Sequence, residues 1–184
     1  VNADSEFAED YFLPAPDKSQ KSLKLEADRI LSSMPPAGLE AYELAHGTDA
    51  RKQLEAAVAE RDFEKIAEIS RRFGHTRAGQ EATLLLGRES LSQGRVLEAV
   101  MHLQRLSESP SAVARFGSEL KVLLAIALKV SSRDDSATEV LKDVGQNSGG
   151  GNADDVSIAG ESVALPGESD DALQWLSAFV SDVR

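Results

Sequence analysis

The sequence contains no cysteine and few aromatic residues. Its 184 residues include six Phe, two Tyr and one Trp. Without cysteine the chain has no disulfides, no thiolate chemistry and no Cys-ligated zinc, and the cellular compartment stays open. Because Leu, Ala, Glu and Ser are plentiful, the core must consist of aliphatic side chains at helical spacing. The composition therefore favours helix over sheet.

Long hydrophobic runs are also missing. The longest strongly apolar run is Val122–Leu128, whereas a membrane-spanning helix needs about 20 such residues. No secretory signal pattern is visible either. We therefore expect one domain with a continuous core and no insertion into a membrane.

The charge is acidic and uneven along the chain. The net charge is −11, of which residues 1–130 contribute −3 and residues 131–184 contribute −8. A nucleic-acid-binding protein normally presents a net basic surface that displaces counterions from the phosphates. We therefore expect no nucleic-acid partner.

Apolar residues recur with a period near 3.6 along most of the chain, which predicts an all-α fold of about eight to nine helices and no sheet. Gly47 is expected to end one helix, and Thr48 or Asp49 to cap the next. Asp62 and Thr76 are further expected N-caps. The expected helices cover residues 23–34, 39–47, 50–58, 63–73, 77–93, 96–106, 111–128, 137–144 and 171–183.

The central helices form hairpins that repeat after about 33 to 34 residues. In the second hairpin Leu86-Gly87, Ala99 and Leu103 stand where the tetratricopeptide pattern has Leu-Gly, a small residue and a large apolar one. Gly87 and Ala99 would let two helices approach closely. Ser90 stands where an aromatic residue is usual. The sequence thus predicts antiparallel hairpins stacked as a short TPR-like solenoid.

This pattern divides the chain into four parts. Residues 1–18 are expected to be an extended lead-in, 19–145 the TPR-like helical repeat domain, 146–169 a flexible acidic linker rich in Gly, Ser, Asn and Asp, and 170–184 a C-terminal helix. The apolar face of Asp171–Val183, with Trp175 and Leu176, is too wide for a free helix. We expect it to dock on the body near Leu128 and Val140.

Three stretches, Ser22–Leu31, Met34–Leu44 and Arg71–Gly87, resemble the N-terminal tetratricopeptide-like helical region of planctomycete-type bacterial PQQ-binding-like β-propeller repeat proteins. The resemblance covers roughly residues 6–145 and departs from the family at Gly74, where an aromatic residue is usual. It implies a periplasmic or exported protein. In that family the propellers are scaffolds or, in some relatives, quinone-dependent dehydrogenases. This chain lacks the propeller, so no propeller function can be assigned to its residues.

The residues that could carry chemistry do not form a catalytic, cofactor or metal site. His46, His75 and His102 do not have the spacing of metal ligands. The glycine-rich segment Gly149–Asp155 is similar to a calcium-binding turn, but a single copy with no flanking strand is more simply a linker. We expect no enzyme activity, no cofactor and no metal.

One group of basic residues is a candidate for binding an acidic ligand: Arg71, Arg72, His75, Arg77 and Arg88. Guanidinium groups hold carboxylates by charge-assisted hydrogen bonds. The alternative is that Arg71 and Arg72 complement the dipole of the helix that they end and pair with nearby Glu residues.

These observations favour a non-catalytic helical-repeat module for protein interaction or scaffolding, as the N-terminal part of a larger β-propeller protein. Its partner is then a protein or peptide, which includes the downstream propeller of the same polypeptide. The alternative is a structural spacer or cap with no separate ligand.

Overall fold

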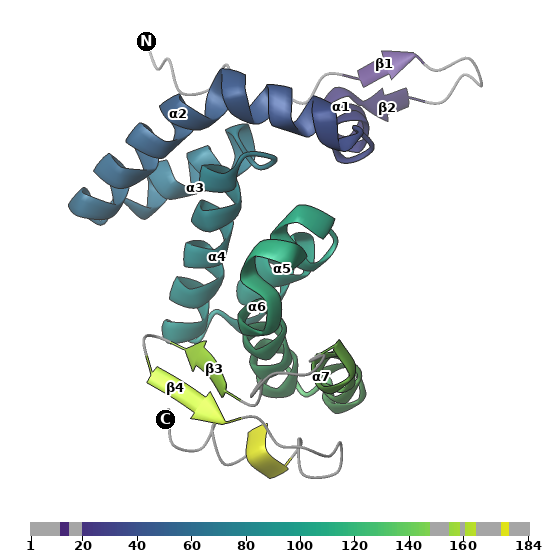
Figure 1. The fold of residues 1–184 in the computed structure, drawn as a ribbon, viewed down its shortest axis with the longest axis vertical. Helices are drawn as coiled ribbons and strands as arrows, with labels where there is room; N and C mark the ends of the chain where they lie inside the picture. The colour runs from purple at the N-terminus through teal and green to yellow at the C-terminus, as the bar shows by residue number, and fades with distance from the viewer. Residues whose placement is uncertain (1–11, 15–19, 148–154, 159–160, 165–173, 177–184) are drawn as a thin grey trace.

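The computed structural model describes residues 12–14, 20–147, 155–158, 161–164 and 174–176. Within them the chain forms seven helices, a helical turn at Gln174–Leu176 and two small β-hairpins (Figure 1). The predicted all-α fold is confirmed for the helical body, whereas the expectation of no sheet is wrong at the two β-hairpins. The strands lie outside the helical stack, in the two segments that flank it.

The N-terminal hairpin joins β1 (Phe12–Pro14) to β2 (Gln20–Ser22) in antiparallel register, with Phe12 opposite Ser22. α1 (Leu23–Ser32) follows directly. Of the lead-in predicted for residues 1–18, only 12–14 lie within the described residues, and they form a strand.

The prediction of two helices on either side of Gly47 is wrong, because α2 runs without a break from Pro36 to Glu60. Gly47 is buried inside this helix, and the carboxylate of Glu43 occupies the space where a side chain at Gly47 would lie. Thr48 and Asp49 are therefore helix-interior residues. α2 ends instead at Arg61, which adopts the left-handed conformation.

Three hairpins make up the stack. α2 pairs with α3 (Phe63–Arg72), α4 (Arg77–Ser92) with α5 (Val96–Ser107), and α6 (Pro110–Val130) with α7 (Asp134–Asn147). The predicted caps hold, since Asp62 accepts a hydrogen bond from Lys65 N and Thr76 accepts one from Gly79 N. Contacts also join α2 to α4 and α4 to α6, so the first helices of successive hairpins lie next to each other.

Two apolar clusters hold the stack together. One, between α2, α3 and α4, contains Leu54, Ile66 and Phe73. The larger one, between α4, α5, α6 and α7, contains Leu103, Leu120 and other aliphatic residues. Both are almost entirely aliphatic, as the scarcity of aromatic residues requires.

α4 and α5 pack closely against each other at Gly87 and Ala99, as the sequence pattern predicted. A Cβ at Gly87 would lie 2.9 Å from Cδ2 of Leu103, and Ala99 on the facing helix is fully buried. Ser90, where the repeat pattern has an aromatic residue, is also buried. Small residues on both helices thus set the distance between them.

α6 consists of two helical segments joined at Gly117, which has φ 52° and ψ −129°. Only glycine adopts this conformation without strain. The apolar pattern of the sequence continues through this point, so it gives no sign of the break.

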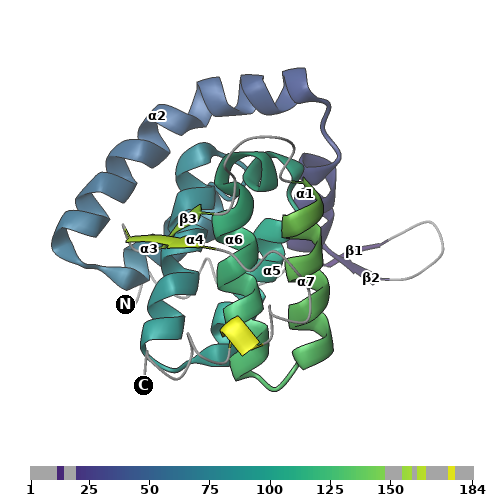
Figure 2. The ribbon, with the colours of Figure 1, turned by 60° about the horizontal axis from the view of Figure 1, so that its bottom comes forward.

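The flexible acidic linker predicted for residues 146–169 contains regular structure where it is described, beginning with the end of α7 at Asn147. β3 (Asp155–Ile158) and β4 (Glu161–Ala164) pair as an antiparallel hairpin, and β3 contacts α6 (Figure 2). Alternation of apolar and polar residues in Asp155–Ile158 was the available signal. The segment Gly149–Asp154 lies outside the described residues.

Of the predicted C-terminal helix, Asp171–Val183, the structure describes Gln174–Leu176 as one helical turn. Leu176 is fully buried in the larger core cluster, which also contains Leu128. Trp175 packs against the same cluster, as does Val140. The other residues of this helix lie outside the described residues.

Gly79 should be the least replaceable glycine in α4. A Cβ there would overlap the carbonyl oxygen of Phe73 and lie 2.8 Å from the backbone nitrogen of Gly74. Gly79→Ala should therefore lower the free energy of unfolding by about 3 kcal/mol or more, measured by urea denaturation. Gly38→Ala is the control, since a Cβ there meets only Met34 at 3.4 Å and adds helix propensity. Equal effects of the two substitutions would contradict this packing.

Leu176→Ala should destabilise the whole fold, because the side chain of Leu176 lies within the core cluster and is 0 % exposed to solvent. Removing such a side chain costs about 2 to 5 kcal/mol. Trp175 is the only tryptophan, so its fluorescence reports on this region. Its emission should be shifted to the blue in the intact chain and to the red in Leu176→Ala. A water-like emission maximum in the intact chain would contradict the packing.

Candidate functional site

The exposed side of α4 forms the centre of a polar surface. Its residues Arg77, Glu81, Leu85 and Arg88 follow one another at helical spacing, and each is at least partly open to solvent. The other sides of α4 are buried against α2, α3, α5 and α6. We call the surface formed by this stripe and the adjoining parts of α2 and α6 the inner face.

Glu81 links three helices across the inner face. Its Oε2 atom lies 2.9 Å from Nη1 of Arg51 on α2 and 3.1 Å from Nη2 of Arg115 on α6. Arg115 also donates from Nη1 to the carbonyl oxygen of Arg77, at 2.6 Å. Further along α4, Arg88 forms an ion pair with Glu119 of α6.

Positive charge exceeds negative charge in this network. The inner-face arginines are Arg51, Arg77, Arg88 and Arg115, and the carboxylates that contact them are Glu81, Glu119 and Glu43, which accepts from Arg77 N. The side chains of Arg51, Arg88 and Arg115 remain 37, 38 and 31 % exposed. A net positive patch is therefore accessible on a chain whose overall charge is −11.

The structure divides the basic group predicted from the sequence. Arg77 and Arg88 lie on the inner face, 11 positions apart along α4, which is about 16 Å. Arg71 and Arg72 lie in the last turn of α3, where Arg72 stacks over the Phe73 ring at 5.1 Å. His75 lies in the α3–α4 loop. The five residues do not form a single surface.

Arg51 and Arg115 were missed by sequence reasoning. They lie 26 and 38 positions from Arg77 in the sequence, and only the packing of α2 and α6 against α4 brings them to Glu81. The available signal was partial: Glu81 and Arg115 are 34 residues apart, which is one repeat, whereas Arg51 and Glu81 are only 30 apart.

The start of α4 is fixed by two helix-capping groups. Thr76 Oγ1 accepts from Gly79 N at 3.0 Å, and Glu43 Oε2 on α2 accepts from Arg77 N at 2.8 Å. A carboxylate at this end also complements the helix dipole. The arrangement sets the position of Arg77 relative to α2.

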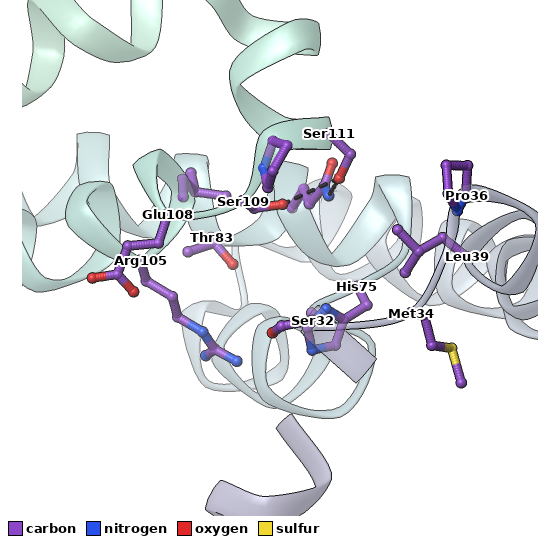
Figure 3. A pocket seen from close by; sticks show the side chains of 14 residues that line it. Ser32, Met34, Pro36, Leu39, His75, Thr83, Arg105, Glu108, Ser109 and Ser111 are labelled. Atoms are coloured by element: carbon purple, nitrogen blue, oxygen red, sulfur yellow. Dashed lines mark hydrogen bonds between the residues drawn. The ribbon is translucent and has the colours of Figure 1, made fainter. Parts of the chain in front are cut away.

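A pocket of about 500 Å³ lies at a different place, where the turn between α1 and α2 faces the α3–α4 and α5–α6 loops. Figure 3 shows Arg105 toward one end of the pocket and Met34, Pro36 and Leu39 toward the other, with His75 between them. Gln80 Nε2 donates to Ser111 Oγ at 2.7 Å in its floor. Arg105, like Arg51 and Arg115, is a basic residue that sequence reasoning left out.

The three histidines lie apart, on α2, in the α3–α4 loop and on α5. His46 stacks on Tyr42 with ring centroids 4.7 Å apart. Among the described residues no three His, Asp or Glu side chains are grouped as metal ligands would be. No described helix combines the length and hydropathy that crossing a bilayer requires.

Comparison with known proteins gives no relative for this chain. No protein-family model, no curated protein and no solved structure matches it significantly. The function must therefore be argued from the site itself.

His102 should titrate below its usual range. It is half-buried on α5, with its Cβ 3.7 Å from the position that a Cβ on Gly87 would take. Burial lowers the pKa of His102 below 6.5; Glu98 opposes this shift, and Arg105 and Arg95 add to it.

Because the folded-state pKa is depressed, the stabilisation from neutral His102 is present above the unfolded pKa and is lost as the pH falls through the folded pKa. NMR titration of the ring protons should give a midpoint below 6.5, and His102→Gln should lose less stability than the parent when the pH falls from about 7 to 5. A midpoint above 6.5 would contradict the burial.

Proposed function

We propose that this chain is a non-catalytic helical-repeat module that binds an acidic segment of a partner protein on its inner face. The observation that carries the proposal is the excess of arginine in the Arg51–Glu81–Arg115 network. Guanidinium groups form bidentate hydrogen bonds with carboxylates, which suits them to acidic peptides.

The size of the inner face supports an extended peptide as ligand. Packed helices lie about 8 to 10 Å apart, so α2, α4 and α6 together span roughly 20 Å. An extended chain covers that distance with about six residues. A short acidic stretch could thus contact Arg51, Arg77 and Arg115 at once.

The exposure of the ion pairs also supports binding. Pairs that are about a third exposed contribute at most about 1 kcal/mol, so a ligand carboxylate can replace Glu81 as the partner of an arginine at little cost. The ion pairs hold the guanidinium groups in place, and a ligand carboxylate can still replace Glu81.

The resemblance to the helical region of PQQ-binding-like β-propeller proteins suggests where this segment belongs. We propose that the module is the N-terminal part of such an exported protein, stacked as TPR-like repeats, and that its ligand is an acidic segment of a partner protein or of the propeller. A spacer with no ligand is the alternative, and it predicts no specific binding on the inner face.

Binding can be tested with a fluorescent peptide of six acidic residues, acetylated and amidated so that it has no terminal charges. Its anisotropy should rise with the full chain at low salt and less so at high salt. Arg51→Gln and Arg115→Gln should each weaken binding about threefold to tenfold. Glu81→Gln should strengthen it, because it removes the carboxylate that competes with the ligand.

Arg95→Gln is the matched control. Arg95 precedes α5 at the N-cap position and pairs with Glu98, away from the inner face, and the substitution removes the same charge. Binding should be unchanged. If Arg95→Gln weakened binding as much as Arg51→Gln, or if Glu81→Gln did not strengthen it, the inner face would not be the site.

A further inference from the structure

The outer side of α5 carries two large apolar side chains that are open to solvent. Leu97 is 67 % exposed and Met101 is 70 % exposed. They are four positions apart, so they lie next to each other on one side of the helix. Single exposed apolar residues are common on protein surfaces, whereas neighbouring ones in the middle of a helix indicate a contact surface.

This side of α5 faces away from the helical stack. The buried residues of α5 belong to the larger core cluster, which also contains residues of its neighbours α4 and α6. Two further exposed residues continue the apolar pair at helical spacing toward the end of α5. We call the surface formed by these four residues the outer stripe: Leu97, Met101, Gln104 and Glu108.

The charges at the two ends of α5 are opposite, and each is at the end that the helix dipole disfavours. Arg95 stands at the N-cap position and Glu108 at the C-cap position, whereas the dipole favours a carboxylate at the first end and a cation at the second. The side chain of Arg95 is 47 % exposed, and its pair with Glu98 offsets only part of this cost. Met101 lies midway, six positions after Arg95 and seven before Glu108.

An antiparallel pair of α5 helices from two copies of the chain matches this pattern. A two-fold axis beside Met101 brings Arg95 of one copy level with Glu108 of the other, at both ends of the pair. The two Met101 side chains then meet at the axis, and Leu97 of each copy extends the apolar strip on either side. A parallel pair would place Arg95 against Arg95 and Glu108 against Glu108. The charges therefore select a second copy in antiparallel orientation.

We propose that two copies of this chain associate through the outer stripe, with α5 packed antiparallel against α5 around a two-fold axis at Met101. Arg95 of each copy pairs with Glu108 of the other. The outer stripe shares no residue with the inner face, so the proposal does not depend on the function of the inner face.

The size of the outer stripe sets the strength of this association. A stable protein interface buries roughly 800 Å² on each partner, and one side of a helix of 12 residues offers less. The dimer is therefore weak and depends on concentration, with a dissociation constant on the order of 100 µM.

Sedimentation velocity of the full chain tests the association. Between about 5 and 500 µM the mean mass should rise from that of a monomer toward that of a dimer. Met101→Glu should raise the dissociation constant at least about tenfold, because it places two carboxylates at the axis. Leu44→Glu is the matched control, since Leu44 is 86 % exposed on α2 and the substitution adds the same charge. It should leave the dissociation constant unchanged.

An exchange of charges tests the orientation. Arg95→Glu and Glu108→Arg each place like charges opposite one another, so each alone should raise the dissociation constant about threefold to tenfold at low salt. The double variant Arg95→Glu/Glu108→Arg has opposite charges at both ends again. It should recover the dissociation constant of the parent chain to within about twofold.

The proposal is overturned if the chain stays monomeric up to about 500 µM, or if Met101→Glu and Leu44→Glu change the dissociation constant equally. It is also overturned if the double variant dimerises no better than the single ones, because the stripe then meets a different surface or orientation. Far-UV circular dichroism shows that each variant keeps the helical fold. None of these variants changes an inner-face residue, so the outcome is independent of the acidic-peptide experiment.

Discussion

The packing around α4 is the constraint on which the rest of the structure depends. This helix contacts α2, α3, α5 and α6, so most of its circumference must be made of residues that allow close approach. Gly79 faces the Phe73 carbonyl, and Gly87 faces Leu103. One stripe is left open, and it carries Arg77, Glu81 and Arg88. The requirement for close packing thus decides where charged side chains can stand, and the inner face follows from it.

The same packing explains why a weak ion-pair network suits a binding surface. Glu81 lies between Arg51 and Arg115 because α2 and α6 both pack against α4. If these pairs were fully buried, the loss of one partner would cost about 3 to 5 kcal/mol, and no ligand could take the place of Glu81. At about a third exposed the cost is far smaller. The pairs can orient the arginines and still give way to a ligand.

The sequence predicted the helices well because periodicity, caps and breakers are local signals. Asp62 and Thr76 cap the starts of helices as expected. The expectation that Gly47 ends a helix was wrong because the glycine makes room for Glu43. Glu43 reaches Arg77 N, a contact between residues 34 positions apart that the local sequence does not reveal. The inner face was only half predicted for a similar reason, since Arg51 and Arg115 join Arg77 through tertiary packing. The pairing of β3 with β4 was missed because the composition of that segment suggested a linker.

The break at Gly117 explains how the charges on α6 are distributed. Arg115 and Glu119 are four positions apart, and in a continuous helix such a pair would lie on one face and neutralise itself. Gly117 stands between them with φ 52°, so the two residues belong to different helical segments. Arg115 turns to Glu81, and Glu119 turns to Arg88. Instead of one local pair, α6 makes two connections to α4, and these place Arg88 and Arg115 on the inner face together. A glycine that costs helix propensity within α6 is therefore what allows the charges of two helices to form one surface.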